Sequence, residues 1–222
     1  MQLPHGNESL FRLKSRLVYH RSALLASGLL AQAVVPLDGL ITRADALREA
    51  REQTQAASLM GAAKRQRADR AADRLVRQVE REALVVVHGN KAHAGFVALF
   101  HPLSAGELVR RPFGEQVAGM GVLADKLDPS QGAPALALSA GLPQRLREAA
   151  ASLKEADEQY QAALARKVPQ SLELTLLREE VTRLLRQDYA DLLALLPQER
   201  DEVEDHFLRF AREDGDDDGA EG

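Results

Sequence analysis

Hydrophobic residues recur along most of the chain with the period of an α-helix. In the second half, leucine and valine return at intervals of three and four residues, which places them on one side of a helix. These positions are 174, 177, 181, 184, 185, 192, 195 and 196. Because the same spacing appears in several long segments, the sequence predicts an all-α fold, an antiparallel helical bundle of about five to seven helices.

The first two expected helices are long. Ser9 can cap a helix that runs to about Val35, because the segment 36–39, Pro-Leu-Asp-Gly, contains two residues that end helices. A second helix is expected over 42–87, and at 1.5 Å per residue it would be roughly 65–70 Å long. Gly61 interrupts its apolar period, so the pattern leaves open whether this helix is continuous or kinked.

Shorter helices are expected next. The sequence His-Gly-Asn at 88–90 is typical of a helix end, and a short helix should occupy 91–100. Ser104 and Glu107 have the spacing of a capping box, which predicts a further helix that ends near Leu127.

Proline and glycine are concentrated at 128–141, which predicts a linker between two helical parts. The expected domains are an N-terminal half over 1–127 and a C-terminal half over 142–212 that packs on it. The C-terminal half should contain helices over 142–167, 171–196 and 198–212. The tetrapeptide Leu-Arg-Glu-Ala occurs once in each half, so two related halves are an open alternative to two unrelated ones.

Composition narrows the fold and the chemistry. Aromatic residues make up 4% of the chain and Trp is absent, so the core must be built mainly from Ala, Leu and Val. There is no Cys, which excludes disulfides, thiolate catalysis and thiolate metal ligands. No stretch has the length and hydrophobicity needed for membrane insertion. We therefore expect a cytoplasmic protein.

Five arginines form the most regular charge pattern in the chain. Steps of three and four residues confine them to an arc of roughly 80° on a helix. This arginine stripe consists of Arg67, Arg70, Arg74, Arg77 and Arg81. The apolar residues expected on roughly the opposite side are Ala68, Ala72, Leu75, Val76, Val79 and Val86. Asp69, Asp73 and Glu80 flank the stripe and should screen it partly.

Three interpretations of the arginine stripe are open. It is a solvated face of mixed charge, a surface for an acidic protein or an acidic part of this chain, or a surface for nucleic acid or another polyanion. From Lys64 to Glu82 there are seven basic and four acidic residues, a net charge of +3, which is far below that of a dedicated nucleic-acid-binding arm. Because no aromatic residue lies on this face to stack on bases, nucleic acid is the least favoured of the three.

The last part of the chain is strongly acidic. Residues 199–222 contain eleven Asp or Glu and three Arg, a net charge of −8, whereas residues 1–198 carry +4. The segment 213–222 is rich in Asp and Gly and is expected to be a disordered acidic tail. Its expected role is to keep the protein soluble, with nucleic-acid mimicry or binding over the arginine stripe as the alternatives.

Histidine is the remaining candidate for metal binding or catalysis. His88, His93 and His101 lie within fourteen residues, and His206 shares a helix face with Glu202. The His-Glu-x-x-His and paired Glu-x-x-His spacings of zinc and di-iron sites do not occur, nor does a phosphate-binding loop. We therefore expect no enzymatic activity, no metal and no cofactor, and we expect the histidines at the surface or near helix ends.

The most hydrophobic short segment contains Phe96 and Phe100. It is expected to close one end of the bundle. The alternative is that these rings, together with Phe113, form a hydrophobic interface for a second copy, because aromatic side chains dominate interface hot spots.

The sequence as a whole predicts a non-enzymatic interaction or scaffold protein that acts through helix surfaces. A protein partner or self-association as a homo-oligomer is expected. The alternatives are nucleic-acid or polyanion binding through 67–81, and a helical-bundle enzyme or metal-binding protein that uses His88, His93 or His206.

Overall fold

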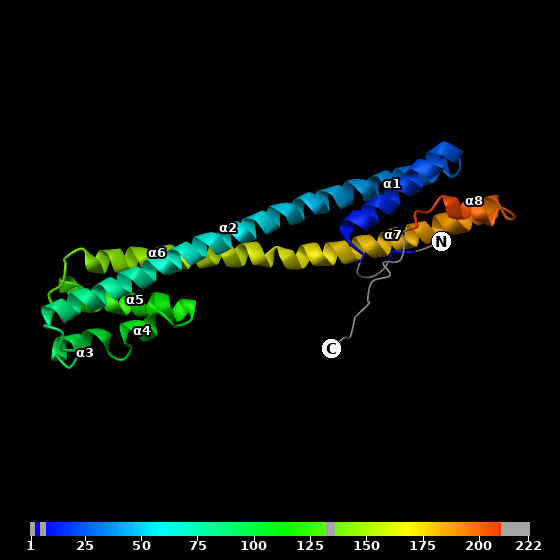
Figure 1. Cartoon of the computed structure of the whole chain (residues 1–222). Coiled ribbons are helices and arrows are strands. Elements are labelled where there is room, and N and C mark those ends of the chain that lie inside the picture. Colours follow the sequence, from blue (N-terminus) through cyan, green and yellow to red (C-terminus); the bar gives the residue numbers. More distant parts are fainter. Residues whose placement is uncertain (1–2, 5–7, 132–135, 210–222) are drawn as a thin grey trace, which may run out of the picture. The chain divides into compact units, whose positions relative to one another are not determined.

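The computed structural model of the chain describes residues 3–4, 8–131 and 136–209 (Figure 1). Every regular element in this part of the chain is helical, which confirms the all-α prediction. Six α-helices there have seven residues or more, and two are shorter. The α-helices are α1 (Leu10–Ser27), α2 (Val34–Val86), α3 (Ala94–Phe100), α4 (Ala105–Leu108), α5 (Phe113–Leu127), α6 (Leu142–Ala165), α7 (Lys167–Leu195) and α8 (Arg200–Asp205). Two short 3₁₀ helices are η1 (Ala31–Ala33) and η2 (Pro129–Gln131).

The chain divides into two compact units. Unit 1 comprises Met1–Gln53 and Lys167–Gly222, and unit 2 comprises Thr54–Arg166. These boundaries differ from the expected division at 128–141. The helices on either side of that segment, α5 and α6, pack against each other in one core, so the segment joins two helices of unit 2. That the chain contains two related halves stays a prediction.

The first helix ends earlier than the sequence predicts. Ser9 caps α1 as expected, since its side chain accepts a hydrogen bond from the Arg12 N–H at 3.3 Å. The helix does not continue to Val35 but ends at Ser27. The reason is Gly28, which adopts a left-handed conformation with φ of +70°, and its N–H bonds back to a carbonyl of the last turn.

Two prolines that lie between helices expected from the sequence are found instead in first turns. Pro36 is the third residue of α2, and Pro169 is the third residue of α7. The first four N–H groups of a helix have no partner within the helix, so a proline there removes no hydrogen bond. As a result α2 begins earlier than expected, at Val34, and runs as one helix through Gly61 to Val86.

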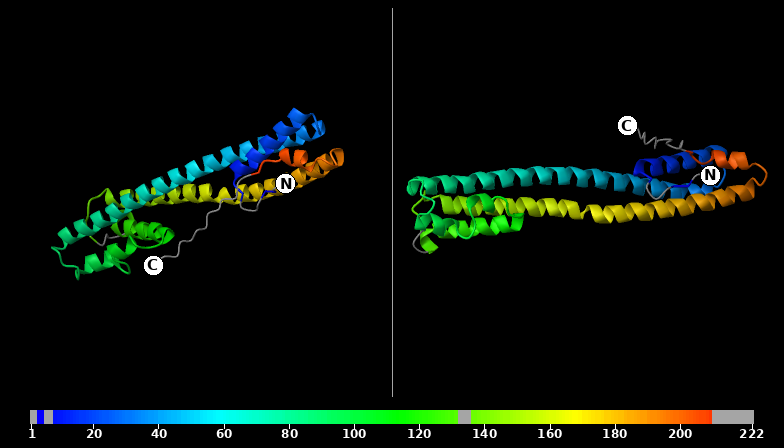
Figure 2. Two further views of the ribbon diagram at one scale, coloured as in Figure 1. Left: turned by 45° about the vertical axis from the view of Figure 1, so that its right-hand side comes forward. Right: turned by 60° about the horizontal axis from the view of Figure 1, so that its bottom comes forward.

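Unit 2 is built around two antiparallel helices, the later part of α2 and α6. The Lys64 ammonium of α2 donates to the Gln159 side chain of α6 at 3.2 Å. Further along α2, the Gln78 side chain accepts from Arg145, which precedes Gln159 on α6, at 3.3 Å. In both views of Figure 2 α5 lies beside α6. Five helices of unit 2, α2 to α6, contribute to its core. One buried residue from each is Val76, Phe100, Leu108, Met120 and Leu146.

At Gly61, α2 approaches α6 closely. A Cβ atom at this position would lie 3.1 Å from the Cα of Tyr160 on α6, which is tighter than most real Cβ contacts. Arg65, one turn further on, also connects the two helices. Its guanidinium pairs with Asp157 at 3.1 Å and lies 5.5 Å from the centroid of the Tyr160 ring.

Unit 1 contains α1, the first part of α2, α7 and α8. Two ion pairs, Lys14 with Asp45 and Arg21 with Asp38, show that α1 and α2 run in opposite directions. The core of unit 1 is mainly leucine, as the composition predicts. Its most deeply buried members include Leu13, Leu17, Leu37, Leu177, Val181 and Val203.

Candidate functional site

The arginine stripe lies on the exposed side of α2 in unit 2. All five of its side chains are exposed. The residues opposite them are buried in the core: Ala72, Leu75, Val76 and Val79. Val86 was expected on the same side but is 45% exposed, because the neighbouring Val87 occupies the buried position. The predicted orientation is therefore confirmed for the stripe and wrong for Val86.

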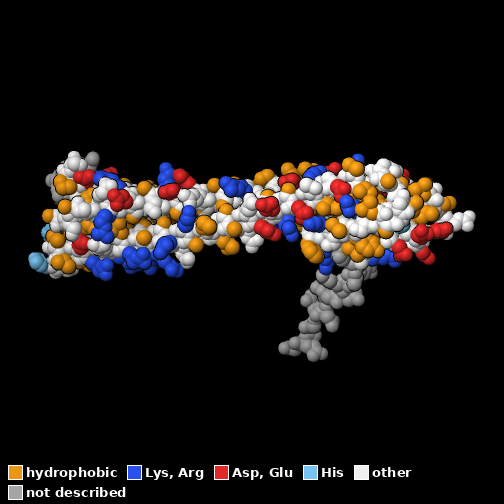
Figure 3. All heavy atoms as spheres, turned by 90° about the horizontal axis from the view of Figure 1, so that it is seen from above, with side chains coloured by type: hydrophobic (Ala, Val, Ile, Leu, Met, Phe, Trp, Pro, Cys, Tyr) orange, Lys and Arg blue, Asp and Glu red, His pale blue; other side chains and the backbone are white. Residues whose placement is uncertain are grey.

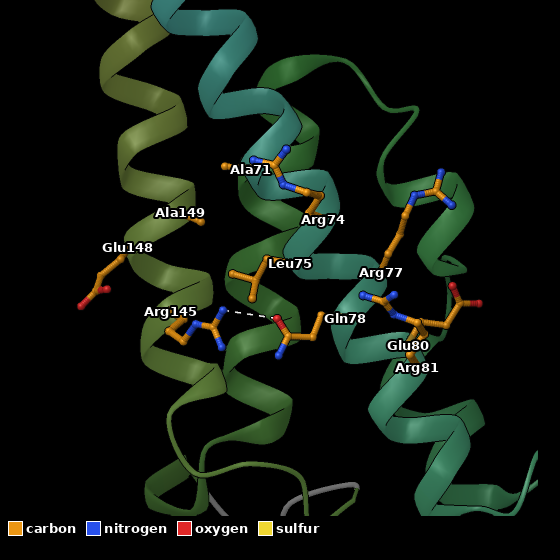
Figure 4. Close-up of a pocket in the computed structure, with 10 residues that line it drawn as sticks. All are labelled: Ala71, Arg74, Leu75, Arg77, Gln78, Glu80, Arg81, Arg145, Glu148 and Ala149. Carbon is orange, nitrogen blue, oxygen red and sulfur yellow. Dashed lines mark hydrogen bonds between the residues drawn. The ribbon is translucent and has the colours of Figure 1, made fainter.

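A groove runs between α2 and α6 beside the stripe. Its larger hollow has a volume of about 920 Å³, and three stripe arginines, Arg74, Arg77 and Arg81, line it from α2. Figure 4 shows Arg145 reaching from α6 toward Gln78 on α2 in this hollow. A second hollow of about 460 Å³ shares Arg74 with the first and extends the surface toward the start of the stripe. The two hollows together are the α2–α6 groove.

The α2–α6 groove is basic. Six basic side chains line it: Lys64, Arg67, Arg74, Arg77, Arg81 and Arg145. Three carboxylates lie among them: Glu80, Glu148 and Glu155. In the described part of the chain, no carboxylate lies within 4.0 Å of a guanidinium nitrogen of the arginine stripe. Figure 3 shows Lys and Arg side chains gathered over unit 2, with Asp and Glu side chains among them.

The acidic flank screens the stripe only partly. Asp73 is directed to α5, where its carboxylate accepts a hydrogen bond from the buried Gln116 amide at 2.9 Å. Burial raises the pKa of Asp73 above its ordinary value, and the Asp69 charge raises it further. The Gln116 hydrogen bond and the Arg77 charge act in the opposite direction. Asp73 therefore influences Arg77 electrostatically without forming a close ion pair with it.

The aromatic segment lies in the unit 2 core. Phe96 and Phe100 are each 8% exposed, and their ring centroids are 5.0 Å apart. Phe113 is half-buried beneath the Arg65 guanidinium, whose carbon lies 4.6 Å from the ring centroid. The rings of Phe96 and Phe100 are therefore part of this core, and that the segment closes one end of the bundle stays a prediction. These positions leave little of Phe96 and Phe100 exposed as an interface for a second copy.

Three of the candidate histidines are exposed and near helix ends, as expected: His88, His93 and His101. His93 is the N-cap of α3, and its Nδ1 accepts a hydrogen bond from the Gly95 N–H at 3.1 Å. Within the described ranges, no group of three or more His, Cys, Asp or Glu side chains is arranged to hold a metal ion.

His206 and His20 are both buried in unit 1. His206 is at the end of α8, in line with the expected position near a helix end, whereas His20 is buried within α1, which corrects the expectation for this histidine. The Nε2 of His20 lies 2.9 Å from the Oδ2 of Asp188, and its Nδ1 lies 3.0 Å from the carbonyl oxygen of His206. The His20 ring also stacks on Phe207, with 4.5 Å between centroids. A carbonyl oxygen can only accept, so Nδ1 donates the hydrogen bond to His206, and Nε2 forms the other hydrogen bond with the Asp188 carboxyl group.

The apolar period of the sequence could have predicted that His20 and Asp188 are buried. His20 follows Leu13 and Leu17 at helical spacing on α1, and Asp188 follows Val181 and Leu185 in the same way on α7. Both polar residues therefore occupy core positions of their helices. A buried polar residue requires a partner, so each predicts one somewhere in the fold.

The remaining sequence features are not part of a described site. The acidic tail, including Asp214 and Asp216–Asp218, lies outside the described residues, as does its predicted disorder. None of the helices in the described part of the chain has the length and hydrophobicity that crossing a membrane requires.

No protein-family model matches the chain, and neither does any curated protein or any solved structure.

Proposed function

We propose that the chain is a non-enzymatic interaction protein and that unit 2 binds an acidic protein segment in the α2–α6 groove. The observation that supports this most strongly is the row of exposed guanidinium groups on α2, with no carboxylate partner among the described residues and Arg145 opposite them on α6. Guanidinium groups bind carboxylates through paired hydrogen bonds. Such a groove therefore favours a partner rich in Asp or Glu.

The mixed charge of the groove favours a protein over a nucleic acid. Glu80, Glu148 and Glu155 lie among the six basic side chains and would repel a uniformly anionic ligand. A protein segment can place a neutral or basic residue opposite each glutamate. Among the described residues that line the groove there is also no aromatic side chain to stack on a base.

Charge reversal along the stripe tests this function. A variant with Arg74→Glu, Arg77→Glu and Arg81→Glu changes only exposed side chains, so it should keep the helical circular dichroism spectrum of the parent. A photo-reactive amino acid at Ala71, which lines both hollows, would capture proteins bound in the groove. We expect the captured proteins to contain acidic segments, and we expect the charge-reversed variant to lose them.

A matched control changes three exposed arginines outside the groove. Arg51→Glu, Arg110→Glu and Arg166→Glu alter the net charge by the same amount and should leave capture unchanged. If both variants capture the same proteins as the parent, the stripe is not a binding surface.

Gel shifts with single- and double-stranded nucleic acid test the alternative that the groove binds a polyanion. Binding that persists at physiological salt would favour a polyanion ligand instead.

A further inference from the structure

We infer that the occupant of the α2–α6 groove is an acidic α-helix that lies along α2 and α6. This inference rests on the proposed function, because it identifies the shape of the acidic partner. The described lining of the groove comes from α2 and α6 alone, so the groove is on a side of this helix pair that α3, α4 and α5 do not cover. The partner helix would complete the bundle on that side.

Small side chains in the groove lining suit close helix packing. Four of the lining residues are alanines from both helices: Ala68, Ala71, Ala149 and Ala156. Helix axes approach to about 8 Å where the side chains between them are small. A helix can therefore lie between the rows of charged side chains and contact the alanine methyl groups directly.

The spacing of the arginines matches carboxylates on a helix. Steps of three and four residues place successive stripe arginines about 4.5 and 6 Å apart along α2. Glutamates at the same steps on a partner helix repeat these distances and stay in register along the whole stripe. On an extended segment, side chains of one face recur about every 6.7 Å, which matches neither of these two steps.

Three blocked peptides of equal charge test the inference. The first is an alanine-rich helix of about 18 residues with glutamates at alternating steps of three and four. Its number of glutamates matches the six acidic residues of the chain's own segment 213–222. The second has the same composition with the glutamates distributed around the helix. The third is the segment 213–222 itself, whose Asp and Gly content disfavours a helix.

Fluorescence anisotropy with the full chain should rank the three peptides at physiological ionic strength. We expect the striped helix to bind about tenfold more tightly than either of the others and to gain helicity on binding. The charge-reversed variant Arg74→Glu, Arg77→Glu, Arg81→Glu should lose this binding. A larger side chain in the groove lining, Ala71→Leu, should weaken binding of the striped helix selectively. The matched change Ala63→Leu, at an exposed position of α2 outside the groove, should have no effect.

The outcomes separate this inference from the function it rests on. Equal binding of the striped and the redistributed helix, or of the striped helix and segment 213–222, would overturn the helical partner. Arginine-dependent binding of any acidic peptide would then still support the acidic-segment function. If none of the three peptides binds in a manner that depends on the stripe, both the inference and the proposed function are wrong.

Discussion

The buried pair of His20 and Asp188 predicts a large loss of stability when the imidazole is removed. In a His20→Phe variant the new ring can still stack on Phe207, so the change removes mainly the hydrogen bonds to Asp188 and to the His206 carbonyl. Asp188 is only 3% exposed and would remain buried. Leaving a buried charge without its partner costs about 3–5 kcal/mol. A typical domain has a total stability of about 5–15 kcal/mol.

Urea unfolding followed by circular dichroism measures this loss. With an m-value of about 2 kcal/mol per molar urea, the midpoint should fall by about 1.5–2.5 M. Hydrogen exchange in peptides from α1 and α7 would assign the change to unit 1. Tyr19→Phe is the matched control on the same helix. It removes one exposed hydrogen bond, to the Asp205 carbonyl, and should cost no more than about 1 kcal/mol.

A double variant distinguishes the lost partner from a general packing defect. His20→Phe combined with Asp188→Ala removes the charge together with its partner, and apolar replacements of buried ion pairs are often neutral or stabilising. The double variant should therefore be more stable than His20→Phe alone. A single variant within about 1 kcal/mol of the parent would refute the reasoning, as would a double variant less stable than the single one.

Two further predictions concern the pKa of Asp128 and two glycines of α2. Hydrogen bonds from Ser130 and Arg147 lower the pKa of Asp128 from 3.8 to about 2, so its carboxylate stabilises the fold above pH 3.8 and loses this effect as the pH falls toward about 2. Thermal unfolding should depend less on pH in this range in Asp128→Asn than in the parent, and equal dependence would contradict the assignment. Gly39→Ala should raise stability by about 0.5–1 kcal/mol, since nothing lies within 4 Å of the added Cβ. Gly61→Ala should lack this gain because of Tyr160, and equal melting temperatures by circular dichroism would contradict the close approach of α2 and α6.

Local sequence signals correctly predicted most of the helices and several of their ends. The Ser9 cap and the reciprocal hydrogen bonds of Ser104 and Glu107 involve residues three positions apart. The turn after α2 occurs at Gly89, whose φ is +78°. Signals of this kind depend on neighbouring residues, so they can be read without knowledge of the fold. Pro36 and Pro169 could not be assigned in this way, because proline is compatible with both a helix end and a first turn.

The helical period also determined which side of α2 carries the arginine stripe. The angle between side chains on one helix depends only on their separation in the sequence, so exposed arginines and buried valines could be predicted together. The residues that lie beside that face could not be predicted in the same way. Arg145 lies across the groove from the stripe only because α6 packs antiparallel to α2 within unit 2.

The sequence by itself thus determined the helical class, the main caps and the outward face of the stripe. Only the tertiary structure decided that this face borders a groove, that the proline- and glycine-rich segment lies within a unit, and that His20 meets Asp188. Those two residues are 168 positions apart. Local preferences act within about one helical turn. The partners of distant side chains are determined by which hydrophobic faces pack together, and that depends on the whole fold.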